Sequence, residues 1–206
     1  MSYRYSCFIS YKRPPQRLGR RQVTLGKLPP KHLWLEFAEA FQYRLDQYLT
    51  VIPSFRDDHL QPGDDYPREL ATSLCQSACL VALVVPEYFE SAWCKTEWAA
   101  MASWEKIRTG NERAQLIFPI ICTGDPSVLR PKFGSRLDID LRDIVSPTKQ
   151  MSSIKTLTKI RSIAEKINSL AKTLPSPLVD CDAYSFGVVG PDVSTPEFGE
   201  LSPFGR

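Results

Sequence analysis

Cys79-Leu80-Val81-Ala82-Leu83-Val84-Val85 is apolar without interruption and ends at Pro86. A strand that is covered on both faces, as in a parallel sheet, carries apolar side chains at every position, whereas a half-exposed strand alternates. Residues 116–122 repeat this pattern, and residues 5–11 form a shorter β-prone run. The sequence therefore predicts several buried strands of a parallel sheet.

Segments with helical periodicity lie between these runs. Apolar residues recur every three or four positions from Trp34 to Tyr48 and from Ile154 to Leu174, with polar residues on the other face. Two shorter helices are predicted, from about Pro67 to Gln76 and from Trp93 to Trp104, and Ser91 is the expected N-cap of the second. Two further strands are predicted at 51–56 and, more weakly, at 138–145. The alternation predicts an α/β fold with right-handed crossovers.

Two segments stand apart from this pattern. Residues 12–30 combine basic side chains with Pro and Gly, which indicates an exposed basic insertion. Residues 175–206 lose the periodicity and are rich in Pro, Gly and Ser, which indicates a flexible tail or linker. We therefore expect one domain over residues 1–174, and ligands at the carboxyl ends of its strands.

Composition excludes several classes of protein. The 206 residues carry a formal charge of +3, too weak to predict nucleic-acid binding. No apolar run approaches the roughly 18 to 20 residues of a membrane span, and no signal peptide opens the chain, so a cytoplasmic location is expected. The six cysteines are scattered, which favours buried free thiols in a reducing compartment. The two histidines, His32 and His59, suit neither a zinc site nor a histidine-dependent triad.

Chemistry is predicted for the stretch Trp93-Cys94-Lys95-Thr96-Glu97. At four-residue spacing the indole and the carboxylate share a helix face, which Met101 and Trp104 continue as an apolar stripe. A carboxylate there is either exposed at a cleft or raised in pKa by desolvation. The simpler interpretation is a surface Glu97 beside a half-buried Trp93 that anchors the helix. We interpret Cys94 as packing, since no histidine is placed to activate it.

Three segments together resemble the sequence boxes of the Toll/interleukin-1 receptor (TIR) domain family. They are Phe8-Ile9-Ser10-Tyr11, Phe55-Arg56-Asp57 followed by Pro62-Gly63, and Ser91-Ala92-Trp93-Cys94-Lys95-Thr96-Glu97. The resemblance covers roughly residues 3–174. It implies a flavodoxin-like, three-layer fold with a central five-stranded parallel sheet. It also implies self-association, filaments included, and in many bacterial and plant members hydrolysis of NAD at the nicotinamide-ribose bond.

The resemblance also implies roles for individual residues. Glu97 matches the family's catalytic glutamate, and Trp93 matches a tryptophan found four residues earlier in several bacterial members. Ser10, Tyr11, Lys12 and Arg13 would line the opposite wall, with Lys12 and Arg13 either near the pyrophosphate of NAD or in a solvated insertion. The residues assigned to a partner-contact loop are Asp57, Asp58, Pro62 and Gly63. No metal is expected in that loop.

The function expected from these observations is that of an assembly-activated NAD glycohydrolase in bacterial immunity and antiviral defence. NAD is its substrate, no cofactor is required, and a sensor domain or partner protein supplies the trigger. The alternative is a non-catalytic module that acts through TIR-TIR contacts, as do members without the glutamate. A nucleoside deoxyribosyltransferase or a response regulator fits less well, since Val84-Val85-Pro86 stands where a phosphoacceptor aspartate should end the strand.

Overall fold

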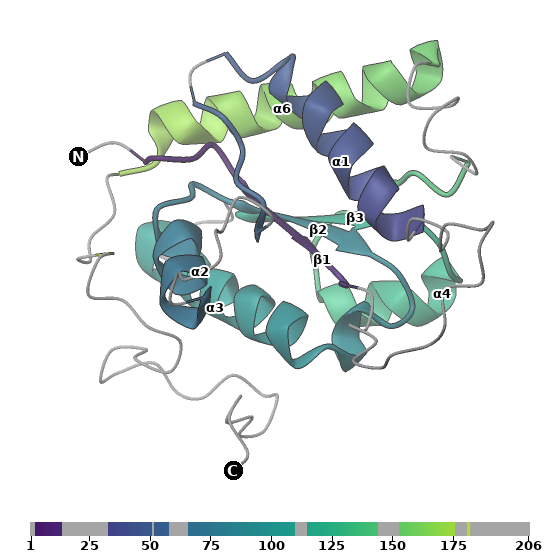
Figure 1. The fold of residues 1–206 in the computed structure, drawn as a ribbon, viewed down its shortest axis with the longest axis horizontal. Helices are drawn as coiled ribbons and strands as arrows, with labels where there is room; N and C mark the ends of the chain where they lie inside the picture. The colour runs from purple at the N-terminus through teal and green to yellow at the C-terminus, as the bar shows by residue number, and fades with distance from the viewer. Residues whose placement is uncertain are drawn as a thin grey trace, which may run out of the picture.

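Four parallel strands form the centre of the protein. The structure, a computed structural model, describes residues 3–13, 33–50, 52–57, 66–109, 115–143, 153–175 and 181. The strands are β1 (Phe8–Tyr11), β2 (Leu80–Val84), β3 (Ile117–Ile121) and β4 (Ile139–Asp140), in the sheet order β1-β2-β3-β4 (Figure 1). Every residue of β1, β2 and β3 is buried, which confirms that the uninterrupted apolar runs are covered on both faces.

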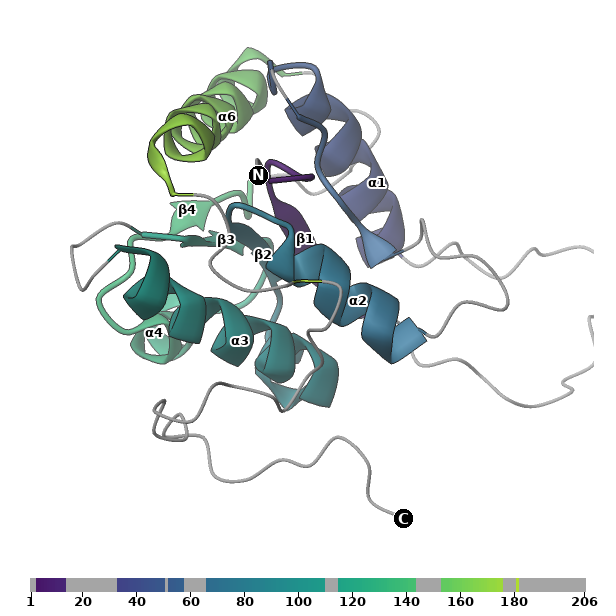
Figure 2. The same cartoon turned by 90° about the vertical axis from the view of Figure 1, so that its left-hand side faces the viewer.

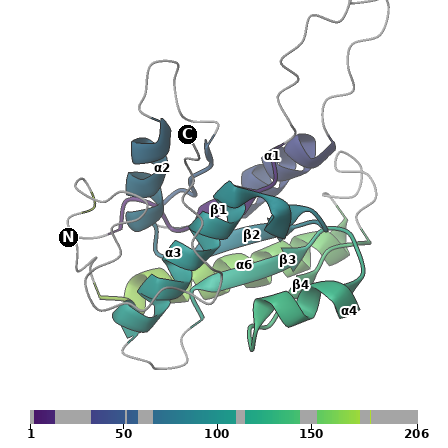
Figure 3. The same ribbon diagram turned by 90° about the horizontal axis from the view of Figure 1, so that it is seen from below.

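Helices cover both faces of this sheet. The long helices α1 (Leu33–Asp46) and α6 (Ile154–Thr173) pack together on one face, and α2 (Tyr66–Cys75) and α3 (Ala92–Thr109) lie on the other (Figure 2). Figure 3 shows α3 crossing the strands from this second side. The arrangement confirms the predicted α/β class with a parallel sheet and agrees with a flavodoxin-like fold. None of the described helices is long and apolar enough to cross a membrane.

The sheet of the described residues has four strands rather than the five that the resemblance implied. Residues 52–57 lie beside β1, where Phe55 forms one isolated bridge to Phe8. Three backbone hydrogen bonds hold this segment: the N–H of Phe55 donates to Cys7, and the carbonyls of Pro53 and Phe55 accept from Ser6 and Ile9. Pro53 has no N–H to extend the ladder. The predicted strand at 51–56 is therefore a short pairing with one isolated bridge rather than a regular strand.

The fourth strand is also shorter than predicted. The N–H of Leu141 still donates to Ile121 of β3 at 2.9 Å, and the chain then turns, with the N–H of Arg142 donating to the side chain of Asp140 at 3.0 Å. Pro119 is tolerated inside β3 because alternate N–H groups point to opposite neighbours. The N–H of Cys122 donates to Val84 of β2, so the nitrogen of Pro119 points toward β4, whose pairing with β3 begins only at Ile120.

Helix ends follow the expected capping chemistry. Ser91 accepts a hydrogen bond from the N–H of Cys94 at 3.4 Å and so caps α3, as predicted. Ser153 caps α6 in the same way. The sequence analysis missed the short elements α4 (Pro126–Leu129) and η3 (Arg130–Phe133), where Asp125 is the N-cap of α4. A third short element, η2 (Tyr88–Glu90), connects β2 to α3.

The prediction that all six cysteines are free thiols is wrong. Cys75 at the end of α2 forms a disulfide with Cys181, 106 residues later, and so joins part of the predicted tail to the domain. The buried Arg108 fixes the same region by donating to the carbonyl oxygens of Cys75 at 2.7 Å and Ser77 at 2.9 Å. The remaining cysteines are free and buried, as expected: Cys7, Cys79, Cys94 and Cys122. Sequence spacing could not identify the bonded pair, because only folding brings α2 and residue 181 together.

Candidate functional site

Ser10, Tyr88 and Glu97 meet at the carboxyl edge of the sheet. They come from the end of β1, from η2 and from the first turns of α3. The hydroxyl of Ser10 donates to Oε2 of Glu97 at 2.5 Å, and the same Oγ lies 2.6 Å from the hydroxyl of Tyr88. The three residues are no more than 5% exposed. A connected set of polar side chains therefore lies where parallel sheets of this class bind their ligands.

Burial controls the charge of Glu97. Removal from water raises the pKa of Glu97 to about 8; the negative charge of Asp57 adds to this, while the hydrogen bond from Ser10 and the charge of Arg13 oppose it. Glu97 is therefore mostly neutral at pH 7 in this state. Of the two expected alternatives, exposure at a cleft and a raised pKa, the structure has the second. A surface position for Glu97 is excluded by its 5% exposure.

The hydroxyl and thiol groups around Glu97 keep their protons. Burial raises the pKa of Tyr88 well above its usual range, and the nearby Cys94 and Glu97 add to the effect. Burial also raises the pKa of Cys94 to about 12, with Glu97 as the second cause. Cys94 is therefore a packed thiol at neutral pH, as the sequence analysis interpreted it, and Tyr88 remains a hydrogen-bond donor.

The remaining apolar face of α3 holds this site in place. Trp93 is half-buried and packs against the core, one helical turn before Glu97. Trp98 contacts Tyr88 edge-on at a ring distance of 6.3 Å and Phe89 at 5.3 Å, so the ring of Tyr88 is fixed by aromatic packing. Trp93 thus has the packing role that the sequence left open, and its side chain is only partly buried.

Asp57 lies in this neighbourhood rather than in a solvated loop. It is 8% exposed, and Oδ2 lies 2.5 Å from Nε of Arg13. Burial, together with a hydrogen bond to Asp57, raises the pKa of Tyr11. Arg56, 5% exposed, donates from Nε to Gln42 on α1 at 2.9 Å. Asp57, assigned from the sequence to a partner-contact loop, is thus buried within the domain, because these contacts hold residues 52–57 against it.

Lys12 has a different environment from its neighbours. It lies just after β1 and lines a small, partly open hollow on the α1 side of the sheet. The other lining residues are Tyr11, Phe37, Leu83, Val85 and Cys122. Ser10 and Tyr11 are adjacent in β1 and point to opposite faces, so this hollow and Glu97 lie on either side of the same strand end.

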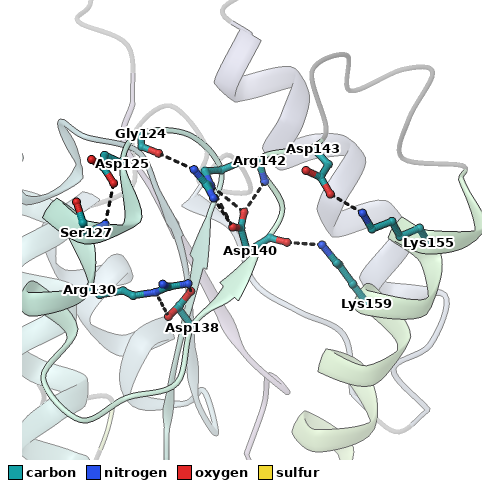
Figure 4. A network of polar contacts seen from close by, with 10 residues as sticks. All are labelled: Gly124, Asp125, Ser127, Arg130, Asp138, Asp140, Arg142, Asp143, Lys155 and Lys159. Atoms are coloured by element: carbon teal, nitrogen blue, oxygen red, sulfur yellow. Dashed lines mark hydrogen bonds and ion pairs between the residues drawn. The ribbon is translucent and has the colours of Figure 1, made fainter.

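A second polar cluster lies at the ends of β3 and β4, and Figure 4 shows its members pointing toward one another. Asp140 accepts hydrogen bonds from the guanidinium of Arg142, and its carbonyl accepts one from Lys159 of α6 at 2.5 Å. The hydrogen bond from Arg142 lowers the pKa of Asp140, and that from Lys155 lowers the pKa of Asp143. These carboxylates remain ionised and paired near neutral pH, so the cluster connects β4 to α6 and is unsuited to proton transfer.

The structure brings together most of the residues that the sequence analysis selected. Ser10 contacts Glu97 directly, Arg13 and Tyr11 contact Asp57, and Trp93 lies one turn before Glu97. Three residues of the expected partner loop, Asp58, Pro62 and Gly63, lie outside the described part of the chain. The sequence analysis missed Tyr88. Its position shortly after the buried run 79–85 could have indicated it, since the residues after such a strand line the ligand edge of the sheet.

Comparison with known families agrees with this architecture. A model of the TIR domain matches residues 32–157. The chain belongs to the TIR domain family. The match contains Trp93, Glu97, Asp57 and Tyr88, whereas Ser10 to Arg13 precede it and are connected to it by the contacts just described. No curated protein matches the chain closely enough to count as a relative. TIR domains include NAD-cleaving enzymes and signalling modules and generally self-associate, so membership leaves the activity of this TIR domain to be argued from its site.

Proposed function

We propose that this TIR domain hydrolyses NAD at the nicotinamide-ribose bond and that Glu97 is its catalytic residue. The observation that carries the proposal is the position of Glu97, a buried carboxyl at the carboxyl edge of the sheet, held by Ser10 and one helical turn after the half-buried Trp93. A carboxyl in such a position suits a reaction in which positive charge develops on a sugar.

The chemistry requires one ionised carboxylate and little acid assistance. When the bond between C1′ of the ribose and the ring nitrogen breaks, its electron pair neutralises the pyridinium and nicotinamide leaves uncharged. Positive charge then develops at C1′, where ionised Glu97 stabilises it. Water attacks C1′ and gives its proton to Glu97, and the products are nicotinamide, ADP-ribose and one proton. Trp93 would stack on the flat nicotinamide ring, at about 0.5 to 2 kcal/mol.

The substrate itself supplies the charge that ionises Glu97. In the described state the pKa of Glu97 is about 8, so only a minor fraction is ionised at pH 7. A nicotinamide cation bound beside the carboxyl lowers that pKa, because an opposite charge favours the ionised form. We therefore regard the described state as a resting state. Lys12 and Arg13 are proposed to contact the pyrophosphate, with Tyr11 beside them. No metal or cofactor is part of this proposal.

The resting state also gives weight to the second candidate function. A carboxyl that is 5% exposed and neutral at pH 7 could belong to a module that acts only through TIR-TIR contacts. We favour the enzyme, because an interaction module has no use for a buried carboxyl beside a strand end. In either case the proposed setting is an assembly, filamentous forms included, which a sensor or partner protein activates in bacterial antiviral immunity.

The cytoplasmic location proposed for this activity conflicts with the Cys75–Cys181 disulfide, because structural disulfides are rare in reducing compartments. Alkylation of thiols in a fresh cell lysate, followed by mass spectrometry, shows whether Cys75 and Cys181 are reduced or disulfide-bonded in the cell. Unmodified Cys75 and Cys181 that become reactive only after reduction would contradict a reduced cytoplasmic form.

Release of nicotinamide from NAD by concentrated protein tests the two functions. We expect release by the wild type and none by Glu97→Gln, which keeps the shape of the side chain but cannot carry the charge. Glu165→Gln on α6 is the matched control, because Glu165 is exposed and pairs only with Arg161 in the described structure; it should retain full activity. Equal activity of Glu97→Gln and wild type would remove Glu97 from catalysis, and no release by wild type at any concentration would favour the interaction module.

A further inference from the structure

The hydrogen bonds of Ser10 have only one arrangement once Glu97 is ionised. A serine hydroxyl carries a single proton, and an ionised carboxylate can only accept. Ser10 must then donate its proton to Oε2 of Glu97, 2.5 Å away. The contact of Ser10 with the hydroxyl of Tyr88, at 2.6 Å, must therefore be donated by Tyr88, and the protonated thiol of Cys94 is a further hydrogen-bond partner of Ser10. Two hydroxyls in series thus point toward the carboxylate.

Tyr88 is suited to be the first donor of this series. It is fully buried, and its ring is fixed by edge contacts with Trp98 and Phe89, at ring distances of 6.3 and 5.1 Å. A hydroxyl that is buried on a fixed ring neither rotates into water nor loses its proton at neutral pH. Such a donor polarises the next hydroxyl and strengthens its hydrogen bond to the carboxylate.

The two oxygens of Glu97 are therefore not equivalent. Oε2 is occupied by Ser10, whereas the described residues give Oε1 no hydrogen bond. Glu97 retains 5% exposure. The free lone pairs of Oε1 are those that remain for a substrate atom or for the proton of the resting acid.

We propose that Tyr88 and Ser10 are positioning residues that form a directional hydroxyl relay, which occupies Oε2 of Glu97 and leaves Oε1 as the oxygen that acts on the substrate. The role of Oε1 rests on the proposed hydrolysis of NAD. The relay itself, Tyr88 to Ser10 to Glu97, is a property of the folded domain and can be measured without substrate.

The relay is one of several influences on the ionisation of Glu97, so a test must separate it from the others. Among the described residues, the charged groups that act on Glu97 are Asp57, which disfavours its ionised form, and Arg13, which favours it. Cys94 on the same helix and Tyr88 on η2 interact electrostatically with Glu97 but stay neutral near pH 7. Removal of either hydroxyl of the relay leaves all these charges in place.

Titration of the ¹³C-labelled carboxyl of Glu97 by NMR, assigned with Glu97→Gln, tests the relay. We expect Ser10→Ala to raise the titration midpoint by about one to two pH units, because a hydrogen bond to the charged form is lost. Tyr88→Phe should raise it by a smaller amount in the wild type and by nothing further in Ser10→Ala, since the neutral hydroxyl of Tyr88 is hydrogen-bonded to Ser10 and not to Glu97. Ser10→Thr keeps a hydroxyl, so its titration midpoint should lie close to that of the wild type.

Two controls and a second readout make the outcome decisive. Ser103→Ala on the same helix and the exposed Tyr43→Phe remove matching hydroxyls away from Glu97 and should leave the midpoint unchanged. Tyr88→Phe retains the ring packing, so it carries the test even where Ser10→Ala does not fold. An unchanged titration midpoint of Glu97 in Tyr88→Phe would overturn the relay. The relay would also be overturned if Tyr88→Phe shifted the midpoint equally in the wild type and in Ser10→Ala.

The same variants separate the relay from the proposed function. If the wild type releases nicotinamide, the acid limb of the pH profile of kcat should shift in each variant by the same amount as the NMR midpoint of Glu97, while KM changes little. Shifted midpoints in a protein that releases no nicotinamide would reject the enzyme and keep the relay. If activity depends on Glu97 but Tyr88→Phe does not shift the titration midpoint of Glu97, the proposed enzymatic function stands and the relay is rejected.

Discussion

Nε of Arg13 lies 2.5 Å from Oδ2 of Asp57, and this ion pair connects the residues after β1 to the segment that lies beside it. Both charges also act on Glu97, in opposite directions. The pair therefore helps to set the fraction of Glu97 that is ionised, besides holding residues 52–57 in place.

Single substitutions of this pair should move the pH dependence of NAD cleavage in opposite directions. Asp57→Asn removes a negative charge, which lowers the pKa of Glu97, and Arg13→Gln removes a positive charge, which raises it. We expect the acid limb of kcat to shift by about half a unit in each case. Lys155→Gln, an exposed cation on α6, should have no effect. Shifts of the same sign in both variants would contradict this electrostatic role.

Stability should fall as pH rises from about 5 to 8. The pKa of Glu97 is raised by burial to about 8, so over this interval the unfolded chain has released a proton that the folded protein still holds. Fewer protons on the unfolded state mean that the free energy of unfolding decreases with pH. The loss contributed by Glu97 is on the order of 4 kcal/mol over the interval.

Urea unfolding of wild type and Glu97→Gln at several pH values measures this contribution. The difference between the two curves cancels contributions that wild type and variant share, so it isolates Glu97. We expect the variant to lose less stability between pH 5 and 8. Parallel curves would mean that Glu97 titrates at its ordinary pKa in the folded protein.

Two substitutions of Trp93 should separate stacking from packing. Trp93→Ala removes a half-buried indole from the core and should cost about 1 to 3 kcal/mol of stability. Trp93→Phe keeps an aromatic face with a smaller packing loss. We expect Trp93→Phe to retain much of the wild-type affinity for NAD and Trp93→Ala to raise KM severalfold. Equal KM values in both variants and the wild type would leave Trp93 with packing alone.

The disulfide should contribute to the stability of the domain. Cys75 and Cys181 are 106 residues apart, and closing so long a loop restricts the unfolded chain. We expect Cys181→Ser to lower the free energy of unfolding by about 2 to 5 kcal/mol. A thiol reductant should destabilise the wild type to a similar extent and leave Cys181→Ser unchanged. A variant as stable as the oxidised wild type would show that the bond adds nothing.

Activity should depend on self-association. TIR domains generally self-associate, and the proposed site contains Lys12 and Arg13, the first residues of the basic segment 12–30, and Asp57, the first residue of an acidic stretch of the sequence. If charges of neighbouring copies order these segments, specific activity should increase with protein concentration and decrease with added salt, which screens such contacts. Light scattering should follow the same trend. Constant specific activity across a wide dilution series, at both low and high salt, would show that a single chain is competent.

The sequence by itself determined the elements of this protein. The apolar run 79–85 predicted β2, helical periodicity predicted α1, α3 and α6, and Ser91 predicted the start of α3. These features could be read because they follow from local spacing, which decides which face of a helix or strand is apolar. For the same reason the sequence placed Glu97 one turn after Trp93 on the apolar face of α3.

Only the tertiary structure decided what surrounds Glu97 and what charge it carries. Ser10 and Glu97 are 87 residues apart, and their contact depends on α3 crossing beneath β1. The burial of Asp57 and the partner of Cys75 likewise depend on where distant elements pack. Burial and long-range pairing arise from the whole fold, and they set the pKa of Glu97 and so the chemistry available to it.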